Sequence, residues 1–115
     1  MSKIVYISLP MAGEEETIWE RWEQAQQYIK ETPGYEDANI VSPVNIVDFA
    51  PGKEINKERE HTYGWYIGRD IELLCECTDI LMCYGWQLSR GCRIEHETAK
   101  VMNIQIGRAS CRERV

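Results

Sequence analysis

The sequence lacks any run of lysine or arginine. Its 115 residues include 13 lysines and arginines against 19 aspartates and glutamates, which gives a formal net charge of -6 at pH 7. Proteins that wrap duplex nucleic acid carry a basic patch that neutralises phosphates. We therefore expect no duplex nucleic acid as a partner.

Long apolar runs are also missing. The longest are of the order of residues 79–84, Asp-Ile-Leu-Met-Cys-Tyr, whereas a helix needs roughly 20 apolar residues to cross a bilayer. The N-terminus shows no signal-peptide pattern. We expect a soluble, cytoplasmic protein with no membrane partner.

The cysteines follow no paired pattern. There are five, with an odd total and no C-x-x-C motif: Cys75, Cys77, Cys83, Cys92 and Cys111. Zinc knuckles and disulfide frameworks use regular spacings, so we expect reduced thiols that mostly pack as small apolar side chains. We expect neither a metal nor a cofactor.

A chain of 115 residues has room for one domain. We assign this domain to residues 1–105, because the composition changes at Ile106. Residues 106–115 show no periodicity and include three arginines. They resemble the conceptual translation of a common sequencing adapter, and we expect them to be a non-native tail. The alternative is a genuine basic tail.

Short β-rich runs alternate with helical segments along the domain. Residues 3–9, 39–41 and 79–84 predict buried strands, and residues 103–105 begin a fourth. This alternation predicts right-handed crossovers. The expected fold is an α/β, Rossmann-like (flavodoxin-like) three-layer sandwich with a parallel sheet of four to five strands.

Apolar spacing predicts three helices between these strands. The first starts near Glu14, with acids in its first turn, and its apolar face consists of Ile18, Trp22, Ala25 and Ile29. The second is marked by Ile67, Ile71 and Leu74. The third covers residues 89–102 and has an inner side made of Ile94, Thr98, Val101 and Met102.

In such folds ligands bind at the carboxyl ends of the strands. Three loops follow strand ends, at residues 10–13, 42–45 and 85–91, and we expect them to meet in one cleft. Residues 48–61 form a further loop too polar for the core. The first loop and the strand before it supply four expected ligand contacts: Ser8, Pro10, Met11 and Gly13.

The segment from Gly85 to Glu95 leaves a strand and enters a helix. Small residues, a hydroxyl and free helix N–H groups suit an anion such as phosphate, which makes Ser89, Arg90 and Gly91 candidate contacts. Ser89 is equally typical of a simple helix N-cap, and Arg90 of a solvated helix face. Trp86 is placed to stack on a base, or else to pack in the core.

Three polar residues fall in apolar surroundings: Tyr6 in the first strand, Asp70 in the second helix and Glu95 in the third. Glu97 is a rival carboxylate. Residues two apart on a helix point about 200° apart, so only one of the pair faces the cleft. We favour Glu95, whose face continues through Thr98 and Met102.

Together these features resemble the nucleoside 2-deoxyribosyltransferase-like superfamily. The matching residues occur in the family's order: Tyr6 in Lys-Ile-Val-Tyr-Ile-Ser, the stretch from Tyr66 to Ile71 with Leu74, the strand from Asp79, and the S-x-G-x-x-x-E run from Ser89 to Glu95. The nearest branch is a group of short bacterial and phage domains of unassigned function. It is marked by Gly-Trp before Ser-Arg-Gly and by Ile-Glu-His-Glu after it.

The resemblance implies roles for four residues. Glu95 matches the nucleophile, Asp70 the acid/base carboxylate, Tyr6 the phenol that supports Glu95, and Ser89 a phosphate contact. It thereby implies a nucleotide N-glycosidase or (deoxy)ribosyltransferase acting on a nucleoside 5'-monophosphate, without separating hydrolysis from transfer. Relatives are dimers or larger oligomers, so a homo-oligomer is expected, with interface candidates Trp19, Tyr28 and Tyr63.

Leu9 departs from the family pattern, in which glycine is common at this position. A bulky side chain there narrows the place where a sugar or phosphate approaches the backbone. The departure motivates an alternative, a non-catalytic nucleotide-binding module such as a phage protein that sequesters a nucleotide or an ADP-ribose-type immune signal. A purely structural role is a third alternative.

Overall fold

A computed structural model describes residues 2–13, 15–52 and 61–109. In this part of the chain, strands and helices alternate as the sequence predicted. The strands are β1 (Ile4–Ser8), β2 (Asn39–Val41), β3 (Asp79–Met82) and β4 (Gln105–Arg108). The α-helices are α1 (Ile18–Lys30), α2 (Tyr63–Leu74) and α3 (Arg90–Val101), and two short 3-10 helices are η1 (Ile46–Phe49) and η2 (Trp86–Leu88).

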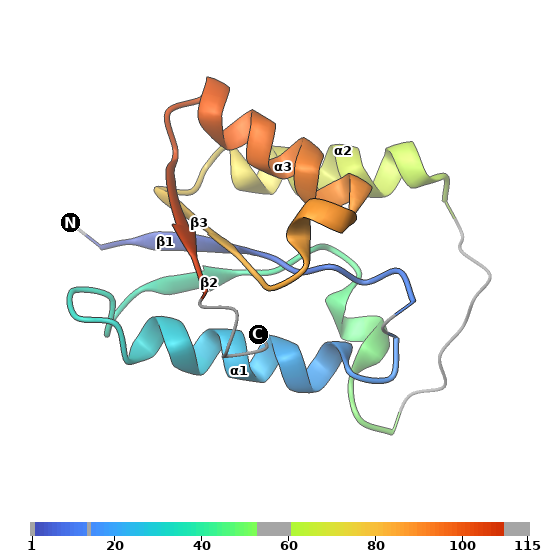
Figure 1. Cartoon of the computed structure of the whole chain (residues 1–115), viewed down its shortest axis with the longest axis horizontal. Coiled ribbons are helices and arrows are strands. Elements are labelled where there is room, and N and C mark those ends of the chain that lie inside the picture. The colour runs from blue at the N-terminus through green and yellow to red at the C-terminus, as the bar shows by residue number, and fades with distance from the viewer. Residues whose placement is uncertain (1, 14, 53–60, 110–115) are drawn as a thin grey trace.

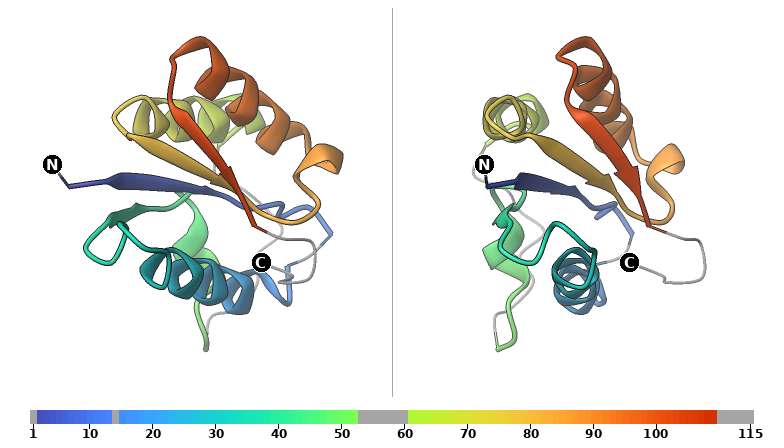
Figure 2. Two further views of the ribbon diagram at one scale, coloured as in Figure 1. Left: turned by 60° about the vertical axis from the view of Figure 1, so that its left-hand side comes forward. Right: turned by 90° about the vertical axis from the view of Figure 1, so that its left-hand side faces the viewer.

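The strands form one parallel sheet in the order β2-β1-β3-β4. Figure 1 shows α2 and α3 on one side of this sheet and α1 with η1 on the other. The two turned views in Figure 2 show the same three layers. The predicted Rossmann-like α/β sandwich is therefore confirmed, with four strands among the residues that the structure describes.

Alternation along β1 sends its side chains into two different layers. Val5 and Ile7 pack in the cluster between the sheet and α1, whereas Tyr6 packs in the cluster between the sheet and the other two helices. Ser8 follows Tyr6 at a spacing of two, so its hydroxyl points to the same side. The strand thus presents two hydroxyls to α3.

The buried face of α1 matches the prediction, since Ile18, Trp22, Ala25 and Ile29 are its buried residues. The predicted start of this helix was wrong. It begins at Ile18 rather than near Glu14, so Glu15 and Glu16 lie in the preceding turn, and Glu14 is outside the described residues.

The predicted inner side of α3 was also wrong. Its buried residues are Cys92, Glu95 and Ala99, while Ile94, Val101 and Met102 are exposed. The physical reason is that Glu95 bonds to the hydroxyls of β1. Adjacent helix positions lie about 100° apart. When Glu95 faces the sheet, Ile94 and the apolar residues on its side of the helix therefore face solvent.

The last strand begins later and extends further than expected, since β4 starts at Gln105 and Asn103 lies in the turn before it, with a φ of +59°. β4 pairs Ile106 with Ile80 and Arg108 with Met82, so the sheet includes residues of the segment that was expected to be a tail from residue 106. The rest of that segment, residues 110–115, lies outside the described residues, as does the middle of the polar loop at residues 53–60. No described helix combines the length and apolar character needed to span a membrane.

Candidate functional site

A pocket of about 880 Å³ lies where the carboxyl ends of the strands meet the helices. Pro10, Pro43 and Gly85 line it, and they represent the loops after β1, β2 and β3. The three loops therefore meet around one pocket, as predicted. Ligand pockets have volumes of roughly 300–1,000 Å³, so this one has the size of a small-molecule site.

Glu95 lines this pocket and is only 4% exposed. Tyr6 Oη donates a hydrogen bond to its Oε2 at 2.7 Å, and Ser8 Oγ donates one to its Oε1 at 2.7 Å. Each carboxylate oxygen thus accepts one hydroxyl from β1. The sheet therefore fixes the orientation of the carboxylate toward the pocket.

The surroundings of Glu95 keep its titration near neutral pH. Burial raises the pKa of Glu95 to about 7, the bonds from Ser8 and Tyr6 lower it, and the charge of Asp70 raises it. Burial, with the adjacent charge of Glu95, raises the pKa of Tyr6 well above its ordinary value. Tyr6 therefore remains a neutral donor while Glu95 changes its charge.

Asp70 is the second buried carboxyl group that lines the pocket, and it is 8% exposed. Its Oδ1 accepts the backbone N–H of Val44 at 2.8 Å, which ties α2 to the loop after β2. Burial raises the pKa of Asp70 to about 6, against the bond from Val44, which lowers it. Two carboxyl groups with raised pKa values at one pocket are typical of acid/base chemistry.

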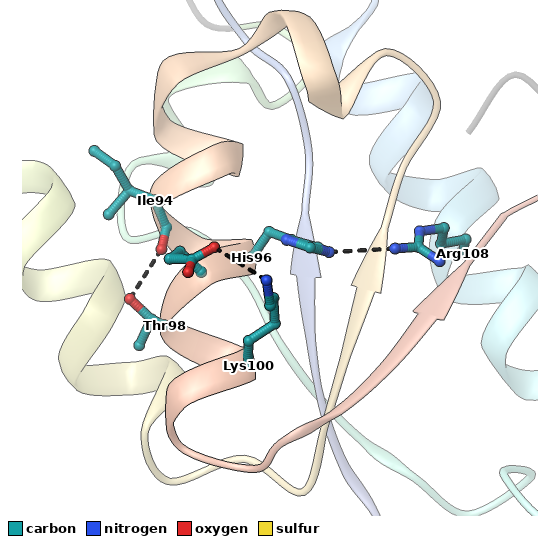
Figure 3. Close-up of polar contacts among 6 residues, drawn as sticks. Ile94, His96, Thr98, Lys100 and Arg108 are labelled. Carbon is teal, nitrogen blue, oxygen red and sulfur yellow. Dashed lines mark hydrogen bonds and ion pairs between the residues drawn. The ribbon is translucent and has the colours of Figure 1, made fainter.

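The rival carboxylate lies elsewhere on α3. The Glu97 side chain is 66% exposed and approaches Lys100 Nζ at 3.6 Å. His96, between the two glutamates, lies with its Nε2 3.3 Å from Arg108 Nη2, and Figure 3 shows this contact running from α3 to β4. Of these three consecutive residues, Glu95 is the one that lines the pocket.

The predicted phosphate contacts all line the pocket: Ser89, Arg90 and Gly91. Ser89 also acts as the N-cap of α3, since its Oγ accepts the N–H of Cys92 at 3.3 Å. Its hydroxyl therefore has a structural contact in addition to its place at the pocket. Pro10 and Met11, predicted as ligand contacts, line the pocket as well.

Three other predicted contacts lie outside the pocket lining. Ser8 is fully buried beneath it and bonds to Glu95 instead. Gly13 lies in a turn with a φ of +79°. Trp86 stacks on His96 with ring centroids 4.3 Å apart and is not one of the lining residues.

Leu9 does not narrow the pocket. It is buried in the cluster between the sheet and α1, on the opposite side of the sheet from Glu95, and it is not one of the lining residues. The reason is again the alternation of β1, which continues past Ser8. Leucine in place of the family's common glycine therefore does not reduce the part of the pocket next to Glu95.

Arg21 is a lining residue that the sequence did not reveal. Its Nη1 donates to the Pro10 carbonyl at 3.3 Å and its Nη2 to the Tyr84 carbonyl at 3.0 Å, so it bridges the loops after β1 and β3. The sequence feature that could have indicated Arg21 is an arginine near the start of the helix that follows β1. Tyr63, expected at an interface, likewise lines the pocket.

Within the described ranges, no group of three or more histidine, cysteine, aspartate or glutamate side chains is placed to hold a metal ion. In the same ranges, every buried side-chain nitrogen and oxygen has a hydrogen-bond partner.

Comparison with known proteins finds one family. The family model described as a domain of unknown function (DUF4406) matches residues 3–107. No curated protein and no solved structure matches the chain. The matched range contains all the residues that line the pocket.

Proposed function

Since the chain belongs to the DUF4406 family, whose function is unknown, we propose its activity from the site: it cleaves the base–sugar bond of a nucleoside 5'-monophosphate, as an N-glycosidase or a (deoxy)ribosyltransferase. The observation that carries this proposal is the buried Glu95 carboxylate, held by two hydroxyls of β1 at the pocket. The resemblance to the nucleoside 2-deoxyribosyltransferase-like superfamily supports the same roles.

In the proposed reaction, a carboxylate oxygen of Glu95 attacks C1' of the sugar, and the bond between C1' and the base nitrogen breaks. The electron pair leaves with the base, which takes its proton from Asp70. The transition state resembles an oxocarbenium ion, so the nearby negative charge stabilises it. Water or a second base, deprotonated by Asp70, then displaces Glu95 from C1', which gives hydrolysis or transfer.

Near neutral pH the carboxyl pair shares one proton, and most of it is on Glu95, the group with the higher pKa. Burial raises the pKa values of Asp70 and Glu95 to about 6 and about 7, so between these values the pair holds about one proton in total. The proposed reaction uses the less populated of the two one-proton states, in which Glu95 is ionised and Asp70 carries the proton, and the population of this state has the same pH dependence. We therefore expect a bell-shaped dependence of kcat/KM on pH, with its maximum at about pH 6.5.

Basic side chains offer a place for an anionic group at the pocket, beside three acidic lining residues: Glu20, Asp70 and Glu95. Among the described residues that line it, the basic ones are Arg21 and Arg90. Arg90 is the first residue of α3, where the helix dipole and free N–H groups attract anions. Arg90 and Glu95 are lining residues of the same helix, and the proposal places the 5'-phosphate near Arg90 and C1' near Glu95.

A panel of nucleotides tests the proposal. The purified protein is incubated at about pH 6.5 with the 5'-monophosphates of adenosine, guanosine, cytidine and uridine and of their 2'-deoxy counterparts. Chromatography is expected to show free base from at least one of them. If no base is released, and ligand is instead recovered unchanged after denaturation, the chain is the binding module and the proposed reaction is wrong.

A further inference from the structure

Two residues at the start of neighbouring helices meet at the pocket. Tyr63 is the first residue of α2 and Arg90 the first residue of α3, and both line the pocket. The Arg90 guanidinium carbon lies 4.5 Å from the centroid of the Tyr63 ring. This is the distance of a cation–π contact.

Gly91 makes room for this contact. A Cβ atom at position 91 would lie 2.8 Å from Tyr63 Oη and 3.7 Å from Ile67 Cδ1. The first distance is too short for a real Cβ contact, so a side chain at position 91 would displace the Tyr63 ring. The absence of a side chain at Gly91 therefore lets the ring reach the start of α3, next to Arg90.

A guanidinium with one face on an aromatic ring keeps its N–H groups at the edge available for a planar, paired contact with phosphate oxygens. An arginine at a helix start in solvent otherwise samples many rotamers. The ring therefore reduces the entropy that Arg90 loses when it binds a phosphate.

From this geometry we propose that Tyr63 is a positioning residue that holds Arg90 for the 5'-phosphate and makes the site prefer a nucleotide to its nucleoside. The inference rests on the nucleotide ligand of the proposed function, but not on its chemistry. Tyr63 acts through Arg90, so it is expected to strengthen the binding of the phosphate and not of the base or sugar.

Calorimetric titration tests this inference in the Glu95→Gln background, where ligand is not consumed. The probes are the eight monophosphates named above and their matched nucleosides. Tyr63→Leu is expected to weaken monophosphate binding about two- to fivefold and to leave nucleoside binding unchanged. Tyr63→Phe retains the ring and is expected to retain the preference.

Two further variants separate positioning from a general effect on the fold. Gly91→Ala displaces the ring while adding a better helix former, so it is expected to weaken monophosphate binding as Tyr63→Leu does. In an Arg90→Gln background, Tyr63→Leu is expected to add nothing. Binding is measured without turnover, so the titration still tests the role of Tyr63 if the proposed reaction does not occur.

Three results would overturn the inference. The first is equal weakening of monophosphate and nucleoside binding by Tyr63→Leu. The second is an undiminished effect of Tyr63→Leu when Arg90 is already glutamine. The third is that no monophosphate binds more tightly than its nucleoside.

Discussion

Glu95→Gln is expected to lower the rate of base release by roughly a thousandfold or more, because an amide is a very poor nucleophile for C1'. Glutamine has the shape of glutamate, and its amide can still form hydrogen bonds with the hydroxyls of Tyr6 and Ser8. The loss therefore reports on the chemistry of the carboxylate rather than on a collapsed pocket. Steady-state kinetics with the best nucleotide of the panel measures it.

Glu97→Gln is the matched control on the same helix. It makes the same chemical change two residues further on, where the side chain is exposed and close to Lys100. Its rate is expected to stay within about twofold of wild type, since changes at exposed positions have small effects. A Glu95→Gln rate within tenfold of wild type, or a large loss in Glu97→Gln, would assign the reaction to a different carboxylate.

The same Glu95→Gln substitution is expected to stabilise the fold at alkaline pH. Burial raises the pKa of Glu95 from 4.5 to about 7, so between these values the folded state holds a proton that the unfolded state releases. The free energy of unfolding therefore falls as pH rises through this window. At about 1.4 kcal/mol per pH unit, the fall is roughly 3 kcal/mol, and the neutral variant avoids it.

Urea unfolding at a series of pH values measures this difference. Wild type is expected to lose stability between about pH 4 and pH 7. The Glu95→Gln variant is expected to lose the part of this fall due to Glu95 and to keep the part due to Asp70, whose pKa burial raises from 3.8 to about 6. A variant that is no more stable than wild type above pH 7 would show that Glu95 is not desolvated as described.

The order of strands and helices was predictable because each element carries its own short-range pattern. The β-rich runs are separated by helices with apolar spacing, and parallel pairing follows from this alternation. The convergence of three loops on one pocket follows in turn, because all the strands end at the same edge. The carboxyl-end location of the site was therefore available from the sequence.

The orientation of α3 was not available in the same way. Its apolar residues suggested a face through Ile94 and Val101, but both are exposed. The contact that decides the orientation joins Glu95 to Tyr6 and Ser8, which lie 89 and 87 residues earlier in the chain. Helix periodicity contains no information about such a partner.

The positions of several side chains at and near the pocket are set by loops and short helices, which no simple sequence pattern predicts. Trp86 lies in the short helix η2, which directs it toward His96. Arg21 reaches two loop carbonyls whose positions follow from the loops themselves. β4 is an edge strand with mostly exposed side chains, so its backbone pairing places little demand on residue type, and the composition change at Ile106 did not mark its end.

In the proposed reaction Glu95 becomes covalently attached to the sugar. Intact-mass spectrometry and peptide mapping test it most directly, after incubation with 2'-fluoro-arabino nucleoside 5'-monophosphates, in which fluorine slows the breakdown of a glycosyl-enzyme. We expect one added sugar phosphate, mapped to Glu95 and absent from Glu95→Gln. No adduct, or an adduct on another residue such as Asp70 or Glu97, would contradict it.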